Sequence, residues 1–148
     1  MKKYILLIVA LISSVAISAQ LATATIPQGQ SYASILGTYP IDTVAAKNFV
    51  FNSTQLYPTT QDYIARLDSV SGDPSSVTVA LQGRKFNAAA WTTISTVVWT
   101  RIPALSADTT IVISNATANR YRAFRVNYTV AGNGGITVKN QEFKQYYE

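Results

Sequence analysis

The sequence predicts an all-β protein: an antiparallel β-sandwich or jelly-roll-like domain of about eight strands that follows an N-terminal, signal-type hydrophobic segment. Residues 77–82 and 124–129 alternate apolar with polar side chains, which is the period of strands with one buried face. Segments rich in Val, Ile, Thr, Trp and Tyr recur between turn-forming segments. Hydrophobic residues make up 48% of the 148 residues and charged residues 13%, a composition that favours a packed core over disorder.

The N-terminal segment, residues 1–19, has the layout of a secretory signal peptide. Lys2 and Lys3 form a basic start, residues 4–12 are apolar, and small residues lead to a cut between Ala19 and Gln20. The apolar run is shorter than the roughly 20 residues that a membrane-spanning helix needs. The sequence therefore predicts a cleaved signal and export to the periplasm, cell surface or extracellular space, or a place in a virion if a phage encodes the chain. The alternative is a retained hydrophobic anchor, which is the only link to a membrane that we expect.

Two further units follow the signal segment: an extended N-terminal arm at residues 20–40 and the β-sandwich domain at residues 41–148. The arm has one short predicted strand and is otherwise either a flexible linker or a segment that pairs with a neighbouring subunit's sheet edge. Strands are expected at residues 32–36, 47–52, 63–70, 77–82, 91–100, 109–114, 120–130 and 136–139. A helix is the alternative for residues 63–70, and residues 142–147 are either a terminal strand or a tail. Residues 71–76 (SGDPSS) predict a turn, and residues 131–135 (AGNGG) predict a hairpin turn, since Gly and Asn accept positive φ.

The composition argues against catalysis. The chain has no Cys and no His, so it lacks thiolates, the commonest general base at neutral pH and the commonest metal ligand. The common hydrolase, nucleotide-binding and calcium-loop motifs are absent. Asp68 and Asp73 flank one turn and could together hold Ca²⁺, but turn residues that bond their own backbone are the favoured interpretation. We expect no enzyme activity and no catalytic, cofactor-binding or metal-binding residues.

The charged residues do not predict a nucleic-acid partner. The formal net charge is +5, and two of the positive charges lie in the leader, so the mature chain carries only a small surplus. Alternation along residues 120–130 puts Arg120 and Arg122 on the face of Phe124 and Arg125 on the other, so these arginines should not form one basic patch. Packing along the sheet and ion pairing are the favoured interpretation, and an anionic glycan or nucleic acid is the alternative.

The candidate ligand or interface residues are aromatic: Trp99, Tyr57 and Tyr39. Trp99 lies near the end of a predicted strand, and with the two tyrosines it could form a stacking platform for sugars or an adhesive protein surface. The alternative is that Trp99 caps the core. Trp91 begins the same strand and is expected in the core, and under strict alternation it shares the face of Trp99.

The centre of the chain also carries a set of hairpin signatures. These are Leu81-Gln82-Gly83, Trp91-Thr92-Thr93-Ile94, Tyr121-Arg122-Ala123-Phe124-Arg125-Val126 and the Gly-rich residues 132–138. With them, residues 77–139 resemble the small β-sandwich virion structural proteins of tailed bacteriophages, and discoidin-like sugar-binding modules share them in part. The resemblance implies a passive, assembling domain, such as a decoration, head, tail or fibre-associated part.

The sequence as a whole predicts a non-enzymatic structural or assembly protein, exported or virion-associated, that acts through surface contacts with like subunits or other structural proteins. The expected partners are further copies of the chain or a larger protein assembly. The alternative is a secreted carbohydrate-binding module, for which a glycan is the partner.

Overall fold

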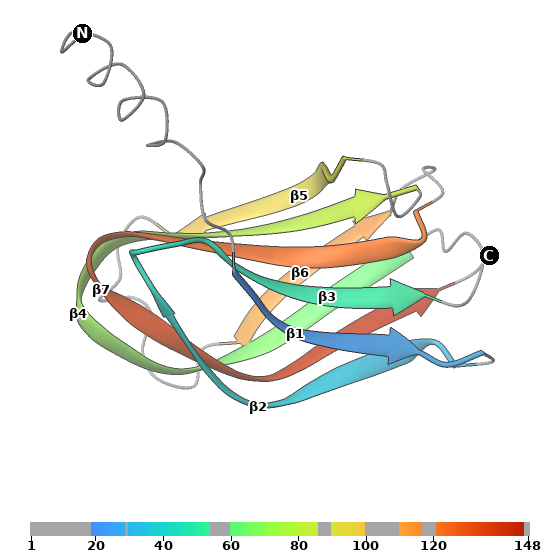
Figure 1. Ribbon diagram of the computed structural model, residues 1–148, viewed down its shortest axis with the longest axis horizontal. Helices are drawn as coiled ribbons and strands as arrows, with labels where there is room; N and C mark the ends of the chain where they lie inside the picture. Colours follow the sequence, from blue (N-terminus) through green and yellow to red (C-terminus); the bar gives the residue numbers. More distant parts are fainter. Residues whose placement is uncertain are drawn as a thin grey trace, which may run out of the picture.

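The computed structural model describes residues 19–28, 30–53, 60–85, 90–99, 110–116 and 121–146, and every element in them is a β-strand (Figure 1). This confirms the predicted all-β fold class. No helix in the described part of the chain is long and apolar enough to cross a bilayer. The signal segment before Ala19 lies outside the described residues. The strands are β1 (Ala19–Ile26), β2 (Tyr32–Asp42), β3 (Lys47–Ser53), β4 (Thr60–Arg84), β5 (Thr92–Trp99), β6 (Thr110–Ala116) and β7 (Ala123–Tyr146).

Two long strands form the frame of the fold. β4 has 25 residues and β7 has 24, far more than the five or six of an average strand. They pair antiparallel along their whole length, from Thr60 opposite Tyr146 to Arg84 opposite Ala123. This two-stranded ribbon curves over at the left of Figure 1. The single sheet is thereby folded into two facing layers, each of which contains half of β4 and half of β7.

The remaining strands attach to the two halves of the ribbon. Layer A has the strand order β1-β3-β7-β4-β5 and contains the first half of β7 and the second half of β4. Layer B contains β2 on the second half of β7 and β6 on the first half of β4. β1 pairs with β3 in parallel, and every other pairing is antiparallel.

The two predicted turns, at residues 71–76 and 131–135, form the bend of the ribbon. The prediction that strands end at these turns was wrong, because β4 and β7 continue through them. Residues 71–76 of β4 lie opposite residues 131–135 of β7, with Gly72 facing Gly134. Both glycines have positive φ, 67° and 132°, a backbone region that side chains with a Cβ rarely adopt. The predicted strands on either side of each turn are therefore halves of β4 and β7, and the described residues form seven strands.

A bulge in β7 sets which side chains reach the core of layer B. Asn140 has a φ of 50°, and the pairing register with β4 shifts at this point. One extra residue reverses the alternation of side chains. Before the bulge Ile136 and Val138 are buried, and after it Gln141 and Phe143 are buried.

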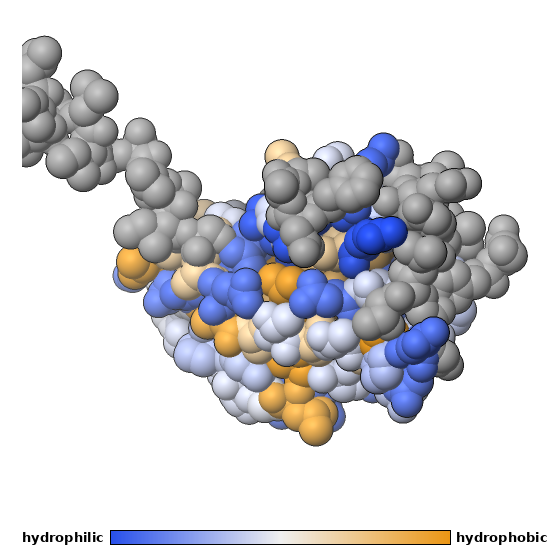
Figure 2. Space-filling view, turned by 45° about the vertical axis from the view of Figure 1, so that its right-hand side comes forward, coloured by the Kyte–Doolittle hydropathy of each residue, from blue (hydrophilic) through white to orange (hydrophobic). Residues whose placement is uncertain are grey.

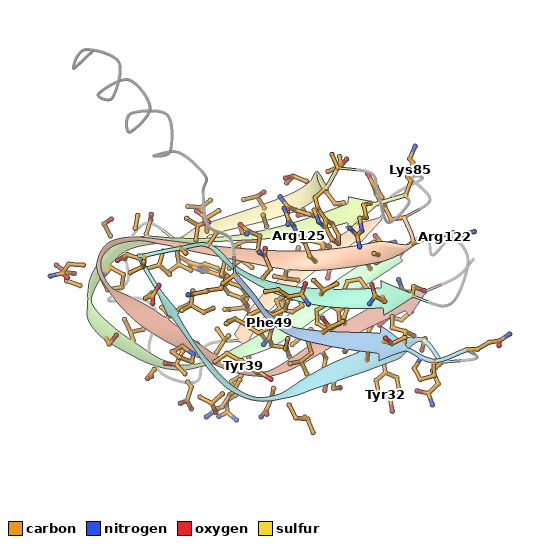
Figure 3. All side chains as sticks on the ribbon, viewed as in Figure 1. Tyr32, Tyr39, Phe49, Lys85, Arg122 and Arg125 are labelled. Carbon is orange, nitrogen blue, oxygen red and sulfur yellow. The ribbon has the colours of Figure 1, made fainter. Side chains whose placement is uncertain are left out.

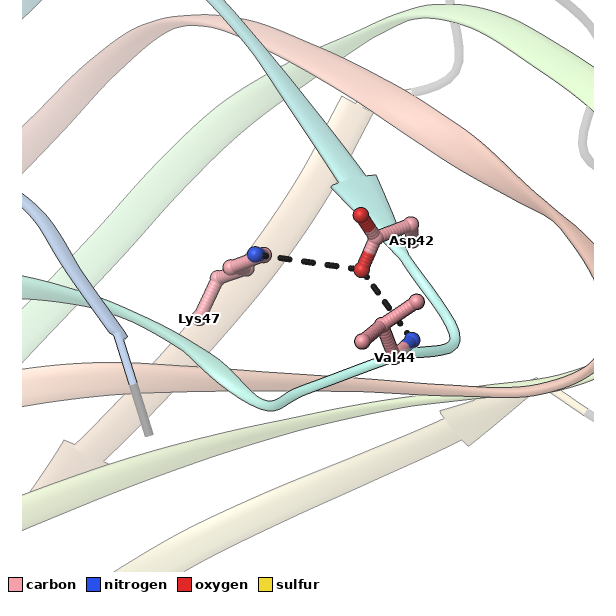
Figure 4. Close-up of polar contacts among 3 residues, drawn as sticks. All are labelled: Asp42, Val44 and Lys47. Carbon is pink, nitrogen blue, oxygen red and sulfur yellow. Dashed lines mark hydrogen bonds and ion pairs between the residues drawn. The ribbon is translucent and has the colours of Figure 1, made fainter. Parts of the chain in front are cut away.

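The segment that was predicted as an extended arm, residues 20–40, contributes a strand to each layer. β1 pairs with β3, and β2, predicted as a short strand, has 11 residues that pair with β7. The connection from β2 to β3 is held by Asp42, whose Oδ1 accepts a hydrogen bond from the Val44 N–H at 3.1 Å (Figure 4). The same oxygen lies 3.8 Å from Nζ of Lys47.

The core is one apolar cluster between the layers. Phe51 and Phe124 of layer A both pack on Phe143 of layer B, with ring centroids 5.0 and 4.9 Å apart. Tyr63 and Tyr128 are also fully buried, and their hydroxyl oxygens lie 2.7 Å apart. The Tyr63 hydroxyl donates to Oε1 of the buried Gln141 at 2.7 Å, so Tyr128 donates to Tyr63. This chain satisfies the hydroxyl groups, which would otherwise destabilise the core.

The bend can be tested by Gly134→Ala. A Cβ at Gly134 would lie 2.1 Å from the Ser71 carbonyl oxygen, so strain and backbone overlap should lower the free energy of unfolding by about 3 kcal/mol or more. Gly37→Ala is the matched control, because Gly37 also has positive φ, 119°, but its Cβ would meet only the Tyr39 ring at 3.4 Å. It should lose about 1 kcal/mol. Equal losses in urea unfolding would contradict the bend described here.

The buried tyrosines predict alkaline instability. Burial raises the pKa of Tyr63 and Tyr128 well above the ordinary value. Tyrosines of the unfolded chain ionise near pH 10 while these two stay protonated, so the unfolded state releases protons first. The free energy of unfolding should fall above about pH 10 by about 1.4 kcal/mol per pH unit for each of the two. In urea-unfolding experiments at several pH values, Tyr128→Phe should make the free energy of unfolding fall less steeply with pH above about pH 10. The same slope as in the wild type would contradict this account.

Candidate functional site

Two of the three aromatic residues predicted as a platform, Trp99 and Tyr39, lie in different layers of the fold. Trp99 ends β5 in layer A, opposite Val77, and it packs half-buried against the core. Tyr39 belongs to β2 in layer B, where its ring meets the buried Phe49 edge-on at 5.1 Å (Figure 3). Tyr57 lies outside the described residues. Of the two positions predicted for Trp99, a ligand platform or a cap on the core, the structure shows the cap on the core.

Trp91, predicted as a core residue, lies instead on the outer face of layer A. The reason is a bulge: Ser95 pairs with Leu81 but Thr93 pairs with Gln82, so Ile94 is an extra residue in β5. The bulge reverses the alternation that would have put both tryptophans on one face. Trp91 and Trp99 thus lie on opposite faces of the layer.

The indole ring of Trp91 carries two guanidinium groups. Cζ of Arg84, from β4, is 4.5 Å from the ring centroid, and Cζ of Arg125, from β7, is 4.8 Å away. A cation over an indole face is attracted by about 0.5–1 kcal/mol at an exposed site and by more when desolvated. Partial burial lowers the pKa of Arg125 from its usual value, and the positive charge of Arg84 lowers it further. The ring therefore holds two like charges near each other.

A row of planar polar groups crosses layer A beside Trp91. Nδ2 of Asn127 donates to Oδ1 of Asn48 at 2.7 Å, which joins β7 to β3. Nε of Arg125 donates to Oε1 of Gln82 at 2.5 Å, and Nε2 of Gln82 donates to Oγ1 of Thr93 at 3.1 Å. These bonds fix the orientation of the amides and of one guanidinium. Amide and guanidinium groups can each take part in several hydrogen bonds.

The row borders a hollow in the protein surface. Its volume is about 260 Å³, and it is lined by Gln20, Asn48, Val50, Arg84, Trp91 and Arg125. Gln20, named in the sequence as the residue after the predicted signal cut, thus reaches the site from β1. Among the described lining residues, buried Val50 is the only aliphatic one, so the part of the hollow that they line is mainly polar.

A second, more open hollow continues the site along β3. It measures about 600 Å³ and is lined by Asn52, Ser53, Arg84 and Arg122. Since Arg84 lines both hollows, the site extends from the neighbourhood of Asn48 to that of Asn52. Arg122 and Arg125 are labelled on this layer in Figure 3, near Lys85, and strongly hydrophilic side chains gather in the upper part of Figure 2.

The sequence predicted Arg122 and Arg125 on opposite faces, but in the structure they line two hollows that share Arg84. The alternation rule does not hold for Arg122, because β7 begins only at Ala123. The preceding residue, Tyr121, is buried in the core. Arg120 lies outside the described residues.

Tyr121 also fixes the end of β4 that presents Arg84. A Cβ on Gly83 would lie 2.5 Å from Cγ of Tyr121, so only glycine lets the tyrosine ring lie against the strand. The Tyr121 ring packs edge-on to Phe124 at 6.0 Å. The backbone N–H of Arg122 donates to the Arg84 carbonyl oxygen at 3.0 Å, so the core positions both arginines.

The described residues offer no cluster of three or more acidic side chains that could hold a metal ion. Asp68, one of the two candidate Ca²⁺ ligands, forms an ion pair with Lys139. Asp73 lies at the bend opposite Asn133. The arrangement on layer A can donate and accept hydrogen bonds and attract negative charge.

Comparison with known proteins assigns this chain to no family. No protein-family model and no curated protein matches the chain. Among solved structures it is similar to the chitosan-binding module 1 of a chitosanase/glucanase from Paenibacillus sp. IK-5, with 17% identity, a TM-score of 0.47 and coverage of 72% of this chain and 74% of that one. It is also similar to a protein of Bacillus endospore appendages, described as disulfide-linked pili, with 10% identity, a TM-score of 0.44 and coverage of 82% and 95%.

A third similar structure is a surface-associated copper-binding protein of Methylomicrobium album BG8, with 10% identity, a TM-score of 0.46 and coverage of 89% and 100%. The resemblance to phage virion proteins is not tested by these matches and stays a prediction. With TM-scores below 0.5 and such low identities, the matches do not tell what this chain binds. The residues of the site are therefore the only basis used for its function.

Proposed function

We propose that this chain is an exported, non-enzymatic binding module that holds a saccharide on the outer face of layer A. The observation that carries the proposal is the row of amides and a guanidinium, fixed by hydrogen bonds from Asn48 to Thr93, beside Trp91 and the hollow. Sugar hydroxyl groups both donate and accept hydrogen bonds, and planar amide and guanidinium groups fixed in advance match them at little entropic cost.

The shape of the site also favours a saccharide. The hollow beside Trp91, of about 260 Å³, is smaller than the roughly 300–1,000 Å³ of pockets that bury a drug-sized ligand. The open hollow beside it continues along β3. A chain of small polar units, with one unit in the hollow beside Trp91 and others in the hollow along β3, fits this form better than a compact apolar ligand does.

Loss of Trp91 should weaken glycan binding. Trp91→Ala removes the ring that holds Arg84 and Arg125, so we expect glycan-array signals and calorimetric affinity to fall about tenfold or more. Tyr32→Ala is the matched control, because Tyr32 is a 53% exposed aromatic residue on layer B, and it should bind as the wild type does. If Trp91→Ala keeps full affinity while Trp99→Ala loses it, the site lies at the position that the sequence first suggested and not here.

Assembly of like subunits is a second candidate function, favoured by the open edges of layer A. β1 and β5 are its outermost strands, each with a single neighbour within layer A in the described part of the chain. Unpaired strand edges readily accept a strand from another molecule. β5 also exposes Val98, at 52%, and an apolar side chain on an edge strand favours such pairing. A virion or cell-surface assembly, as the sequence predicted, would use contacts of this kind.

The assembly reading predicts self-association at high protein concentration in sedimentation-velocity experiments. Val98→Lys should weaken it, because a lysine on an edge strand opposes edge-to-edge pairing. Val112→Lys is the matched control, since Val112 is 50% exposed on β6 of layer B. A wild type that stays strictly monomeric at all concentrations would count against assembly through β5.

A further inference from the structure

We infer that β5 binds the β5 strand of a second copy of this chain, antiparallel and about a two-fold axis, so that layer A continues from one copy into the other. This inference rests on the assembly of like subunits proposed above as the second candidate function. It adds the strand that makes the contact and the register of the pairing. It depends on the composition of β5, on the burial of its core-facing side chains and on the bulge at Ile94.

The outer edge of β5 lacks most of the features that keep edge strands apart. In the described part of the chain β5 pairs only with β4. Its sequence, TTISTVVW, contains no charged residue, no Pro and no Gly, and its Val, Ile, Thr and Trp residues favour strands. Edge strands that stay unpaired usually carry a charge, a Pro or a bulge. Of these, β5 has only the bulge at Ile94, so residues 95–99 remain regular and able to accept another strand.

One edge strand of layer B, β2, shows the contrast. It contains Pro40, which has no N–H to donate, and it ends at the charged Asp42. Its pairing with β7 shifts register between Ile35 and Thr38, and Gly37 between them has a φ of 119°. These features interrupt the row of backbone groups that a further strand would need. The edge of β5 is therefore better suited to pairing than that of β2.

β5 also leaves core-facing apolar side chains partly exposed. Val97 and Trp99 pack against the core, but both are only half-buried. On β6, the edge strand of layer B that contacts β5, Ile111 and Ile113 are each 1% exposed. The core is thus closed at β6 and incompletely covered at β5. The β5 strand of a second copy would cover this apolar surface, and burial of apolar area favours association.

The bulge limits how two β5 strands can pair. Residues directly opposite each other in an antiparallel pair lie on the same face of the sheet. Ser95, Val97 and Trp99 face inward, because their partners on β4 are fully buried. Thr96 and Val98 lie between them and face outward. The longest register that matches these faces puts Val97 opposite Val97 of the second copy, and Thr96 opposite Val98 of that copy.

This pairing is compatible with the proposed saccharide site. The hydrogen-bonded row of that site ends at Thr93, before the bulge, and the paired residues follow the bulge. The two-fold axis of an antiparallel strand pair is perpendicular to the sheet, so the outer faces of layer A in both copies point the same way. The dimer would thus present two saccharide sites on one face, and a long polysaccharide bound to both would be held more tightly.

The test uses single cysteines, because the chain has no Cys of its own. In a glutathione redox buffer, Val97→Cys should form a covalent dimer, since opposite Cβ atoms lie about 4.5–5.5 Å apart, close to the distance in a disulfide. Thr96→Cys and Val98→Cys should each cross-link little alone and about tenfold more when mixed. Both positions are exposed, so these variants test the pairing even if Val97→Cys does not fold. Val112→Cys, at an exposed position of β6, is the matched control and should cross-link little.

The wild type should show a monomer–dimer equilibrium in sedimentation velocity. A strictly monomeric wild type would overturn this inference and the assembly proposal together. A wild type that associates, with β5 cysteines that cross-link no more than Val112→Cys, would overturn pairing through β5 and leave assembly through another surface. Equal cross-linking of Thr96→Cys alone, Val98→Cys alone and their mixture would overturn the register. A series of species larger than the dimer would overturn the two-fold axis and indicate an open chain of copies.

Discussion

The joint bend of β4 and β7 is the constraint on which the rest of the structure depends. Because the two strands are hydrogen-bonded along their whole length, neither can turn without the other. Gly72 faces Gly134 where the ribbon turns, and this removes the Cβ atoms that would collide. The bend brings one half of the ribbon over the other, so the apolar sides of both halves face inward. β2 and β6 can then pair with one half, and β3 and β5 with the other.

The bend also separates the part of the molecule that supplies stability from the part that can bind. All large, fully buried side chains point between the layers, and burying apolar area is the main favourable contribution to folding. The hydrogen-bonded chain from Tyr128 through Tyr63 to Gln141 satisfies the two tyrosine hydroxyl groups in that core. The outer face of layer A contributes little to the core, so its side chains can be polar without loss of packing.

The sequence allowed the fold class and most strand positions to be predicted, because alternation and turn residues are local signals. It did not show that the turn residues of β4 and β7 lie opposite each other. In that register, two segments that each resemble a hairpin turn become one bend, and this depends on pairing between residues far apart in the chain. Asn140 gave no signal either: a single residue with positive φ reverses the alternation and sends Gln141 and Phe143 inward.

An extra residue in a strand is also the reason why the sequence did not predict the site. Strict alternation put Trp91 and Trp99 on one face, and one extra residue, Ile94, puts them on opposite faces. Trp91 then meets two arginines instead of the core. Two arginines share this one ring, and the row of amides fixed by hydrogen bonds lies beside them. A single extra residue in β5 thus turns a side chain expected in the core into part of a polar outer surface.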